Sequence, residues 1–481
     1  MIKSVEFINY RNLNQKFEFN NNLNIIFGNN NFGKTNLLDG IRLAFSTITN
    51  DYFKISKSDF KNSDDTVPIN IKVELEVDSI PSLNFFDENG KIKCGFNVFI
   101  KKTQNGRYIR EVSHLNCSPI DFGILRDDVK LPNVYMIPLA RVEDIYTDGL
   151  VTGISKFINS EEKYRDLKKD SKNAIKEEIK TKKEEFQNFC KKFNQNLDIE
   201  LSEPKISDEK VYIVDGDKEH NYKIGSGYKS IANIILNTLN ENYNIILIDE
   251  IENHLHPSLI RTLIRELRKI KNTIIIGTTH SPVVINELNM EELIDISGKR
   301  LSNISEKNRK KLNVFLHPGR SELMLADNII LVEGYTEELL LNNYLYENNY
   351  NWTVVNVAGI MFEPYIELSI FLNKKVIVVS DNDKSLSDTL QPSERFNNLK
   401  QLCDNYKIKL LEVDNTLETD LYNNGYLENY KDLLKRHKQH NVIYIAKKNR
   451  KTEIAEKLIE DKVDISEWNI IKEIKDEFGG N

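Results

Sequence analysis

Uninterrupted hydrophobic runs mark the strands that the chain is expected to bury. Residues 23–27, 245–248 and 273–276 are almost entirely apolar, which is typical of strands covered on both faces in a parallel sheet. Residues 35–45 and 258–270 have the spacing of amphipathic helices and follow two of these runs. The pattern therefore predicts parallel strands connected by helices in this part of the chain.

Residues 67–113 follow another pattern, in which hydrophobic and polar residues alternate. Alternation is typical of strands with one buried face, and turn signals at 88–90 and 104–106 predict an antiparallel arrangement. Residues 160–193 instead place hydrophobic residues at helical spacing in a highly charged background. They predict an amphipathic helix or helical pair, inserted at about 155–200. A solvated surface helix and a dimerisation element both fit this pattern.

A second alternation of strands and helices begins after the turn at residues 317–319. Its strand candidates are 328–332, 352–355 and 376–379, with helical stretches between them. The tail is highly charged and has mostly helical spacing. The expected organisation is a first domain over 1–325, a second over 326–425 and a C-terminal extension over 426–481.

The composition of the 481 residues excludes several classes of protein. A net charge of −7 excludes a uniformly basic coat for nucleic acid but is compatible with local basic grooves. No stretch approaches the ~18 consecutive apolar residues of a membrane span, and the N-terminus lacks the apolar core of a signal peptide. The four cysteines are too scattered for a disulfide scaffold or a structural zinc site. We therefore expect a cytoplasmic protein without a membrane partner.

A loop with two glycines, between the first predicted strand and the first predicted helix, has the chemistry of a nucleotide site. Its sequence, GNNNFGKT, fits GxxxxGK[ST], and its position between strand and helix is that of a P-loop. Its residues are Gly28, Asn29, Asn30, Asn31, Phe32, Gly33, Lys34 and Thr35. Backbone N–H groups of such a loop turn toward phosphates. Lys34 would reach the β- and γ-phosphates of ATP, and the Thr35 hydroxyl would bind Mg²⁺.

Two acidic residues follow the apolar run at 245–248. Asp249 can position Mg²⁺ and Glu250 can polarise the attacking water. These roles suit the residues because phosphoryl transfer depends mainly on positioning and charge neutralisation. The acidic pair therefore strengthens the nucleotide-site prediction.

Two further segments resemble a known class of ATPase. Residues 225–230, GSGYKS, resemble a degenerate ABC-type signature, and residues 278–282, TTHSP, resemble an H-loop. Together with the P-loop and the acidic pair, they resemble the ABC ATPases typified by SMC- and RecF-like proteins. The resemblance implies that two subunits sandwich ATP, with Ser226 of one acting on the nucleotide of the other. It also implies that His280 contacts the γ-phosphate and that the protein forms a homodimer or higher homo-oligomer.

A second group of acids follows the strands predicted in the carboxy half. Glu333 ends the strand at 328–332, Glu337 comes four residues later, and Asp381 and Asp383 follow the strand at 376–379. Carboxyl ends of parallel strands converge on one edge of a sheet, so we expect these side chains to meet there. Their oxygens are the ligands that Mg²⁺ or Mn²⁺ prefers.

A strand followed by Glu-Gly and a later strand followed by DxD is the Toprim pattern of topoisomerases, primases and certain nucleases. Residues 416–421, TLETDL, and 451–455, KTEIA, resemble segments of the OLD (overcoming lysogenisation defect) family of endonucleases, which includes Gabija-type anti-phage nucleases. The order of ABC/SMC-like P-loop ATPase domain with helical insertion, Toprim α/β domain and mostly helical C-terminal extension is also that of the family. The resemblance spans nearly the whole chain.

This resemblance implies a two-metal site. Glu333 and Glu337 would hold one ion, Asp381 and Asp383 would share in the other, and Glu418 would complete the cluster. Two such ions can activate water and stabilise the leaving oxygen of a phosphodiester displacement. Lys451 would neutralise the scissile phosphate; alternatively, it is a solvated lysine of the basic run 447–451 that contacts backbone phosphates without a catalytic role.

The leading hypothesis is a metal-dependent DNA endonuclease or nickase, regulated by ATP binding or hydrolysis, in anti-phage defence. The resemblance leaves a UvrD-like helicase partner open. One rival hypothesis is an SMC/RecF-like repair ATPase that binds DNA without cutting it. This hypothesis does not explain the second group of acids. A topoisomerase or primase would need strand-passage or zinc modules that the sequence lacks. An interaction protein with a retired nuclease site is the remaining alternative.

Overall fold

The computed structural model describes most of the chain in two compact units, Met1–Arg300 and Leu301–Asn481. The described residues are 2–29, 33–46, 55–76, 85–86, 92–114, 134–137, 184, 187–188, 191–192, 197–201, 211–215, 226–238, 244–315, 318–359, 361–440, 443–447 and 450–478. The division between the units precedes the domain boundary expected at residues 325 and 326. The segment 301–325 thus packs with the second unit, as helices α9 (Glu306–Phe315) and α10 (Pro318–Leu325).

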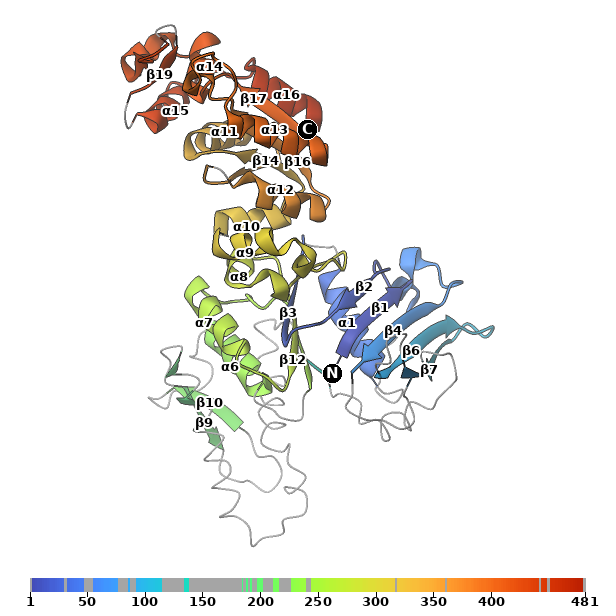
Figure 1. The fold of residues 1–481 in the computed structure, drawn as a ribbon. Coiled ribbons are helices and arrows are strands. Elements are labelled where there is room, and N and C mark those ends of the chain that lie inside the picture. Colours follow the sequence, from blue (N-terminus) through green and yellow to red (C-terminus); the bar gives the residue numbers. More distant parts are fainter. Residues whose placement is uncertain are drawn as a thin grey trace. The chain divides into compact units, whose positions relative to one another are not determined.

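The first unit contains an antiparallel sheet, as the alternating pattern predicts (Figure 1). Its order is β2-β1-β4-β6-β5, and β7 also pairs with β6. The strands are β1 (Ile2–Ile8), β2 (Lys16–Glu18), β4 (Ile69–Leu75), β5 (Phe85–Phe86), β6 (Ile92–Lys102) and β7 (Tyr108–His114). Every second residue of β4 is buried, and these side chains share one core with helix α1 (Lys34–Phe45).

A parallel sheet in the same unit carries the predicted apolar strands. Its order is β13-β3-β12-β11-β8, and all neighbours are parallel. The strands are β3 (Leu23–Phe27), β8 (Val134–Ile137), β11 (Ile245–Ile248), β12 (Ile274–Thr279) and β13 (Leu293–Asp295). The accompanying helices are α1, α6 (Ser226–Thr238), α7 (Pro257–Leu267) and α8 (Pro282–Glu287). Every residue of β3, β11 and β12 is buried, which explains why their sequences are mostly apolar.

Most of the helical stripe predicted at 160–193 lies outside the described residues. Of the described residues in this stretch, Glu184, Gln187, Asn188 and Lys191 are helical. A strand, β9 (Leu197–Leu201), follows the stretch and pairs antiparallel with β10 (Val211–Asp215). The dimerisation role of this region stays a prediction. No helix in the described parts of the chain is long and apolar enough to cross a bilayer.

The second unit is built on a parallel sheet of order β15-β14-β16-β17. Its strands are β14 (Asn328–Val332), β15 (Thr353–Asn356), β16 (Lys375–Asp381) and β17 (Lys409–Val413). The main helices are α11 (Tyr335–Glu347), α12 (Phe362–Phe371) and α13 (Glu394–Tyr406). Because β14 and β16 are hydrogen-bonded neighbours, with Val332 opposite Val379, their carboxyl ends lie side by side.

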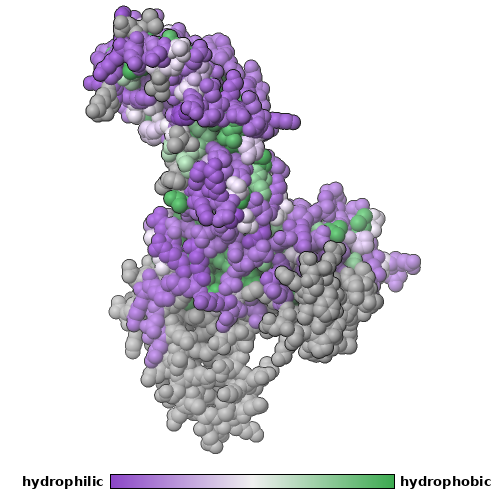
Figure 2. Space-filling model, viewed as in Figure 1, coloured by the Kyte–Doolittle hydropathy of each residue, from purple (hydrophilic) through white to green (hydrophobic). Residues whose placement is uncertain are grey.

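The C-terminal extension packs onto this sheet's core. Helix α14 (Leu417–Asn423) precedes the extension. The extension contains α15 (Lys451–Glu460) and α16 (Asn469–Phe478), together with an antiparallel pair, β18 (Leu434–Arg436) and β19 (Tyr444–Ala446), that the sequence pattern did not predict. Trp468 is buried in the core and donates its indole N–H to Asp420 Oδ2 at 2.6 Å. Hydrophilic residues predominate over the described elements on the face shown in Figure 2, as expected once these apolar side chains are buried.

Candidate functional site

The P-loop sequence lies between β3 and α1, and its described residues include hydrogen-bond partners of its lysine. Lys34 is only 6% exposed, and its ammonium donates to the carbonyl oxygens of Gly28 at 2.7 Å and Asn29 at 2.9 Å. Burial lowers the pKa of Lys34, while nearby acids oppose that shift. Gly33 has φ 99°, and an added Cβ would lie 2.4 Å from the Asn12 amide oxygen, so only glycine fits there. Three further predicted loop residues, Asn30, Asn31 and Phe32, lie outside the described residues.

The structure brings the predicted magnesium residues of this site into direct contact. Thr35, in the first turn of α1, donates its hydroxyl to Asp249 Oδ2 at 2.8 Å. Thr278, at the end of β12, donates to the other oxygen, Asp249 Oδ1, at 2.7 Å. One hydroxyl and one carboxylate from neighbouring elements thus face the same point beside Lys34, where a nucleotide-bound Mg²⁺ fits.

The predicted water-polarising residue and the predicted γ-phosphate contact also lie together. His280 Nδ1 is 3.5 Å from Glu250 Oε1 and 3.2 Å from Glu252 Oε1. The His280 backbone N–H donates to the same Glu252 oxygen at 2.9 Å. Glu250 has φ 48°, and its N–H is held by the Thr278 hydroxyl at 2.8 Å. A non-glycine residue in this left-handed region is uncommon and is often found at functional sites.

Glu252 is a site residue that the sequence interpretation missed. It touches both the backbone and the ring of His280, and its Oε2 is buried with no hydrogen-bond partner among the described residues. His280 Nδ1 makes no hydrogen bond within the described residues, so Glu252 holds His280 through its backbone N–H and places a carboxylate beside the ring. The clue in the sequence was an acid two positions after the predicted Asp-Glu pair, but its contact with His280 depends on the fold.

Arg11 is a second residue that the sequence interpretation missed. Its guanidinium, at the end of β1, donates to Asn36 Oδ1 at 2.7 Å and Asp39 Oδ2 at 2.9 Å, both on α1. It also donates to Asp59 at 2.9 Å. These bonds fix the first turns of α1 and thereby position the P-loop residues that begin this helix.

Ser226 begins α6, as its resemblance to a signature motif predicts. Its side chain lies outside the described residues, so its action on a partner's nucleotide stays a prediction. The neighbouring Gly227 packs so closely that an added Cβ would lie 2.6 Å from the His254 carbonyl oxygen. The start of α6 therefore lies against the loop that follows Glu250 and Glu252.

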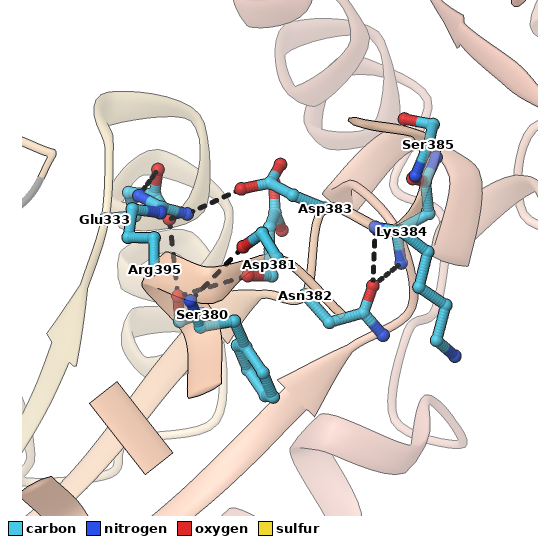
Figure 3. A network of polar contacts seen from close by, with 11 residues as sticks. Glu333, Ser380, Asp381, Asn382, Asp383, Lys384, Ser385 and Arg395 are labelled. Atoms are coloured by element: carbon cyan, nitrogen blue, oxygen red, sulfur yellow. Dashed lines mark hydrogen bonds and ion pairs between the residues drawn. The ribbon is translucent and has the colours of Figure 1, made fainter. Parts of the chain in front are cut away.

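In the second unit, the predicted acids gather at the carboxyl ends of β14 and β16. Ser380 of β16 donates to Glu333 Oε2 at 3.3 Å, which joins the two strand ends directly. Figure 3 shows the Arg395 guanidinium between Glu333 and Asp383. It donates to Glu333 Oε1 at 2.6 Å, to Glu333 Oε2 at 2.8 Å and to Asp383 Oδ2 at 2.8 Å.

The remaining acids of the cluster repel one another in a buried setting. Asp381 is 8% exposed, and burial raises its pKa well above the usual value, helped by Glu337, Glu333 and Glu418. Burial also raises the pKa of Glu337, and the charges of Glu333 and Glu418 add to that shift. These shifts place the predicted acids within electrostatic reach of each other. Burial raises the pKa of Asp383 as well, against the attraction of Arg395.

Glu418, near the end of the second domain, and Lys451, in the C-terminal extension, lie at the same cluster. Glu418, in the first turn of α14, is 1% exposed, and its Oε1 lies 3.7 Å from the exposed Lys451 ammonium at the start of α15. Partial desolvation by the surrounding protein lowers the pKa of Lys451. The negative charges of Glu418, Asp381, Glu337 and Glu333 outweigh this desolvation, so the Lys451 pKa is raised overall. Glu418 Oε2 is buried with no hydrogen-bond partner among the described residues.

The chemistry of this cluster fits a hard divalent cation. Among the described residues, no three His, Cys, Asp or Glu side chains are already gathered as a metal-ligand set, and Glu333 and Asp383 contact Arg395 instead. Yet the donors are all carboxylate oxygens, and a buried carboxylate oxygen without a partner, such as Glu418 Oε2, is costly. Mg²⁺ or Mn²⁺ would relieve that cost and the repulsion around Asp381.

Comparisons with known proteins match both halves of the chain. A family model described as an AAA ATPase domain matches residues 125–285, which include Asp249, Glu250 and His280. One described as the TOPRIM domain of overcoming lysogenization defect protein-like proteins matches residues 324–383, from the end of α10 to Asp383. The predicted ATPase and Toprim assignments, and with them the α/β fold class, are confirmed.

Similar proteins include two from Bacillus cereus that are named endonuclease GajA. The one from strain HuB5-5 is 26% identical over 232 residues, covering 38% of this chain and 33% of the relative. The one from strain VD045 is 24% identical over 437 residues, covering 78% of this chain and 74% of the relative. This chain thus spans about a third of the first relative and three quarters of the second. A solved structure of an Smc head domain bound to the C-winged helix domain of ScpA is similar over 61% of this chain and 94% of its own length, at 15% identity and a TM-score of 0.46.

Proposed function

Because this chain joins an AAA ATPase domain to an overcoming lysogenization defect-like Toprim domain, we propose that it is a metal-dependent DNA endonuclease or nickase regulated by ATP, acting in anti-phage defence. The observation that carries the proposal is the convergence of Glu333 and Asp381 at adjacent strand ends with Glu418 and Lys451. The endonuclease name of the GajA relatives supports the same reaction class.

In this proposal, the acids of the second unit bind the metal. The ligand set is Glu333, Glu337, Asp381, Asp383 and Glu418. Bound Mg²⁺ or Mn²⁺ supplies water activation and stabilisation of the leaving oxygen. The Lys451 ammonium, exposed and 3.7 Å from Glu418, neutralises the phosphate being cut. The exposure of Lys451 leaves its ammonium accessible to a DNA backbone, while Glu418 orients it.

The first unit binds and hydrolyses ATP in the proposed function. Lys34 exchanges its contacts with the loop carbonyl oxygens for the β- and γ-phosphates. Thr35 and Asp249 hold the nucleotide's Mg²⁺, Glu250 polarises water, and His280 contacts the γ-phosphate. Glu252 orients His280 through their two contacts. We include self-association in the proposal because Ser226 would complete the site of a second subunit.

The experiment that tests this function incubates the purified full chain with supercoiled and linear DNA, with and without ATP and with and without Mg²⁺ or Mn²⁺. Metal-dependent nicking or linearisation is expected, with a rate that changes when ATP is added. Absence of cutting under every condition, with ATP hydrolysis intact, would reject the nuclease. It would favour a repair-type ATPase that binds DNA without cutting it.

A further inference from the structure

Arg395 has a position in the second unit that the proposed catalytic roles do not explain. It comes from α13, yet its guanidinium spans an acid after β14 and an acid after β16 (Figure 3). Both carboxylate oxygens of Glu333 accept from it, at 2.6 and 2.8 Å. Paired charge-assisted bonds of this kind are strong and geometrically specific. Arg395 therefore ties together two acids that the proposed function assigns to metal binding.

The guanidinium and a metal ion would require the same oxygen atoms. A hard divalent cation binds carboxylate oxygens directly, at distances shorter than a hydrogen bond. Both Glu333 oxygens and Asp383 Oδ2 accept from Arg395. A cation placed between these two acids would therefore meet the positive guanidinium and compete with it for the same carboxylates.

We propose that Arg395 is a built-in counter-cation, which occupies the place of the metal between Glu333 and Asp383 and must be displaced when a divalent cation binds. The inference rests on the proposed function, because it needs these acids to be metal ligands. In the metal-free protein, the guanidinium keeps the two strand ends together and reduces the repulsion within the acid cluster. Metal loading is therefore an exchange of one cation for another, and Arg395 sets its affinity.

A cavity beside Arg395 gives the displaced side chain a place to go. The cavity has a volume of about 300 Å³ and lies between α12 and α13. Its lining residues are Phe362, Glu363, Arg395, Asn398, Leu399 and Leu402. Apolar side chains can cover the methylene groups of an arginine, and the Glu363 carboxylate offers a new partner for the guanidinium. Glu363 is partly exposed and pairs with Lys307 at 3.0 Å, a surface contact that is easily exchanged.

The test is Mn²⁺ binding to the full chain, without nucleotide or DNA, measured by electron paramagnetic resonance of the free ion. Arg395→Gln should bind Mn²⁺ about tenfold more tightly than the wild type, because the ion no longer displaces a guanidinium. Arg395→Lys keeps the charge but loses the paired bonds, so its affinity should lie between the two. Arg395→Lys also allows the proposal to be tested if Arg395→Gln folds poorly.

Lys384→Gln is the matched control. Lys384 and Arg395 have the same exposed side-chain fraction, 34%, but Lys384 pairs with Asp414 at 2.8 Å rather than with the cluster. Removing its charge should leave Mn²⁺ affinity within about twofold of the wild-type value. A gain in Lys384→Gln equal to that in Arg395→Gln would mean that net charge, rather than occupancy of the site, sets affinity, and would overturn the proposal.

The remaining outcomes separate this inference from the proposed function. Equal Mn²⁺ affinity in the wild type, Arg395→Gln and Arg395→Lys would overturn the role of Arg395 while leaving the nuclease site in place. Mn²⁺ binding by Arg395→Gln, with none by the wild type or Arg395→Lys, would support the proposal and would mean that the ion cannot displace the Arg395 guanidinium at the concentrations used. Binding by none of the proteins would overturn both ideas. As a second readout, Arg395→Gln should lower the melting temperature of the metal-free protein, and saturating Mn²⁺ should remove that difference.

Discussion

The two units place acids at the same structural position, the carboxyl edge of a parallel sheet, but neutralise them differently. In the first unit, Asp249 accepts one hydroxyl on each oxygen, from Thr35 and Thr278. In the second, Asp381 is buried among other carboxylates, and repulsion reinforces the rise of its pKa. Hydroxyl groups of the protein thus satisfy both oxygens of Asp249. The acids around Asp381 need a cation to offset their repulsion, and Arg395 provides one only for Glu333 and Asp383.

The largest expected effect is loss of DNA cleavage from the second site. Glu333→Ala or Asp381→Ala should lower metal-dependent plasmid cleavage by roughly a thousandfold, because each removes a proposed metal ligand at the point of charge development. Gel assays of nicked and linear product measure this, and ATP binding should stay normal.

Asp414→Asn provides the control for these ligand variants. Asp414 lies near the cluster but pairs with Lys384, so this variant should cut at the wild-type rate. Wild-type cleavage by both ligand variants would reject the assignment of the acid cluster.

The second prediction concerns nucleotide affinity in the first unit. Lys34→Ala should weaken ATP binding by about tenfold to a hundredfold, since charged hydrogen bonds to phosphate contribute about 1.5–3 kcal/mol. Isothermal titration calorimetry with a non-hydrolysable ATP analogue measures the change. Unaltered affinity would contradict the P-loop assignment, and Mn²⁺ binding at the second site without nucleotide should be unaffected.

A smaller effect is expected at Glu252, which touches His280 rather than the nucleotide. Glu252→Gln should lower kcat for ATP hydrolysis by about tenfold, with little change in KM, because the ring of His280 loses its anionic partner. A parallel loss of ATP affinity, or no change in kcat, would remove Glu252 from the positioning role.

The smallest expected effect is on the thermal stability of the protein, which should change in opposite directions when an acid of each site is neutralised. Asp381→Asn keeps the shape of the side chain but removes a buried like charge, so the metal-free protein should gain about 1 kcal/mol and melt about 2–4 °C higher. Asp249→Asn should instead destabilise, because its two hydroxyl donors lose a charged acceptor. Differential scanning calorimetry in chelator compares them, and shifts of the same sign would contradict the proposed contrast.

The sequence was informative where a pattern is local. Buried strands, such as β3 and β11, and the acids that follow them are recognisable because a hydrophobic run, a glycine loop or a Glu-Gly step is contiguous. The meeting of Glu333 and Asp381 could also be predicted, because the carboxyl ends of parallel strands lie at the same edge of a sheet. The contacts of Arg395 with Glu333 and of Glu252 with His280 could not be predicted, since they join distant positions that meet only through packing.

The packing of residues 301–325 could not be predicted from the sequence either. Its helices α9 and α10 precede the first strand of the Toprim sheet, and the boundary expected after residue 325 assigned this segment to the first domain. In the structure, α9 contacts α12, and α10 contacts β15. Helical periodicity identifies an apolar face but does not determine which core covers it.

The central claim is that acids from adjacent strand ends share divalent cations. Anomalous diffraction at the manganese edge, from crystals soaked in Mn²⁺, tests it most directly. The account predicts peaks between the carboxylates of Glu333, Asp381 and Glu418, with the Arg395 guanidinium moved away from Glu333. Manganese peaks elsewhere, with Arg395 still bound to Glu333, would contradict it.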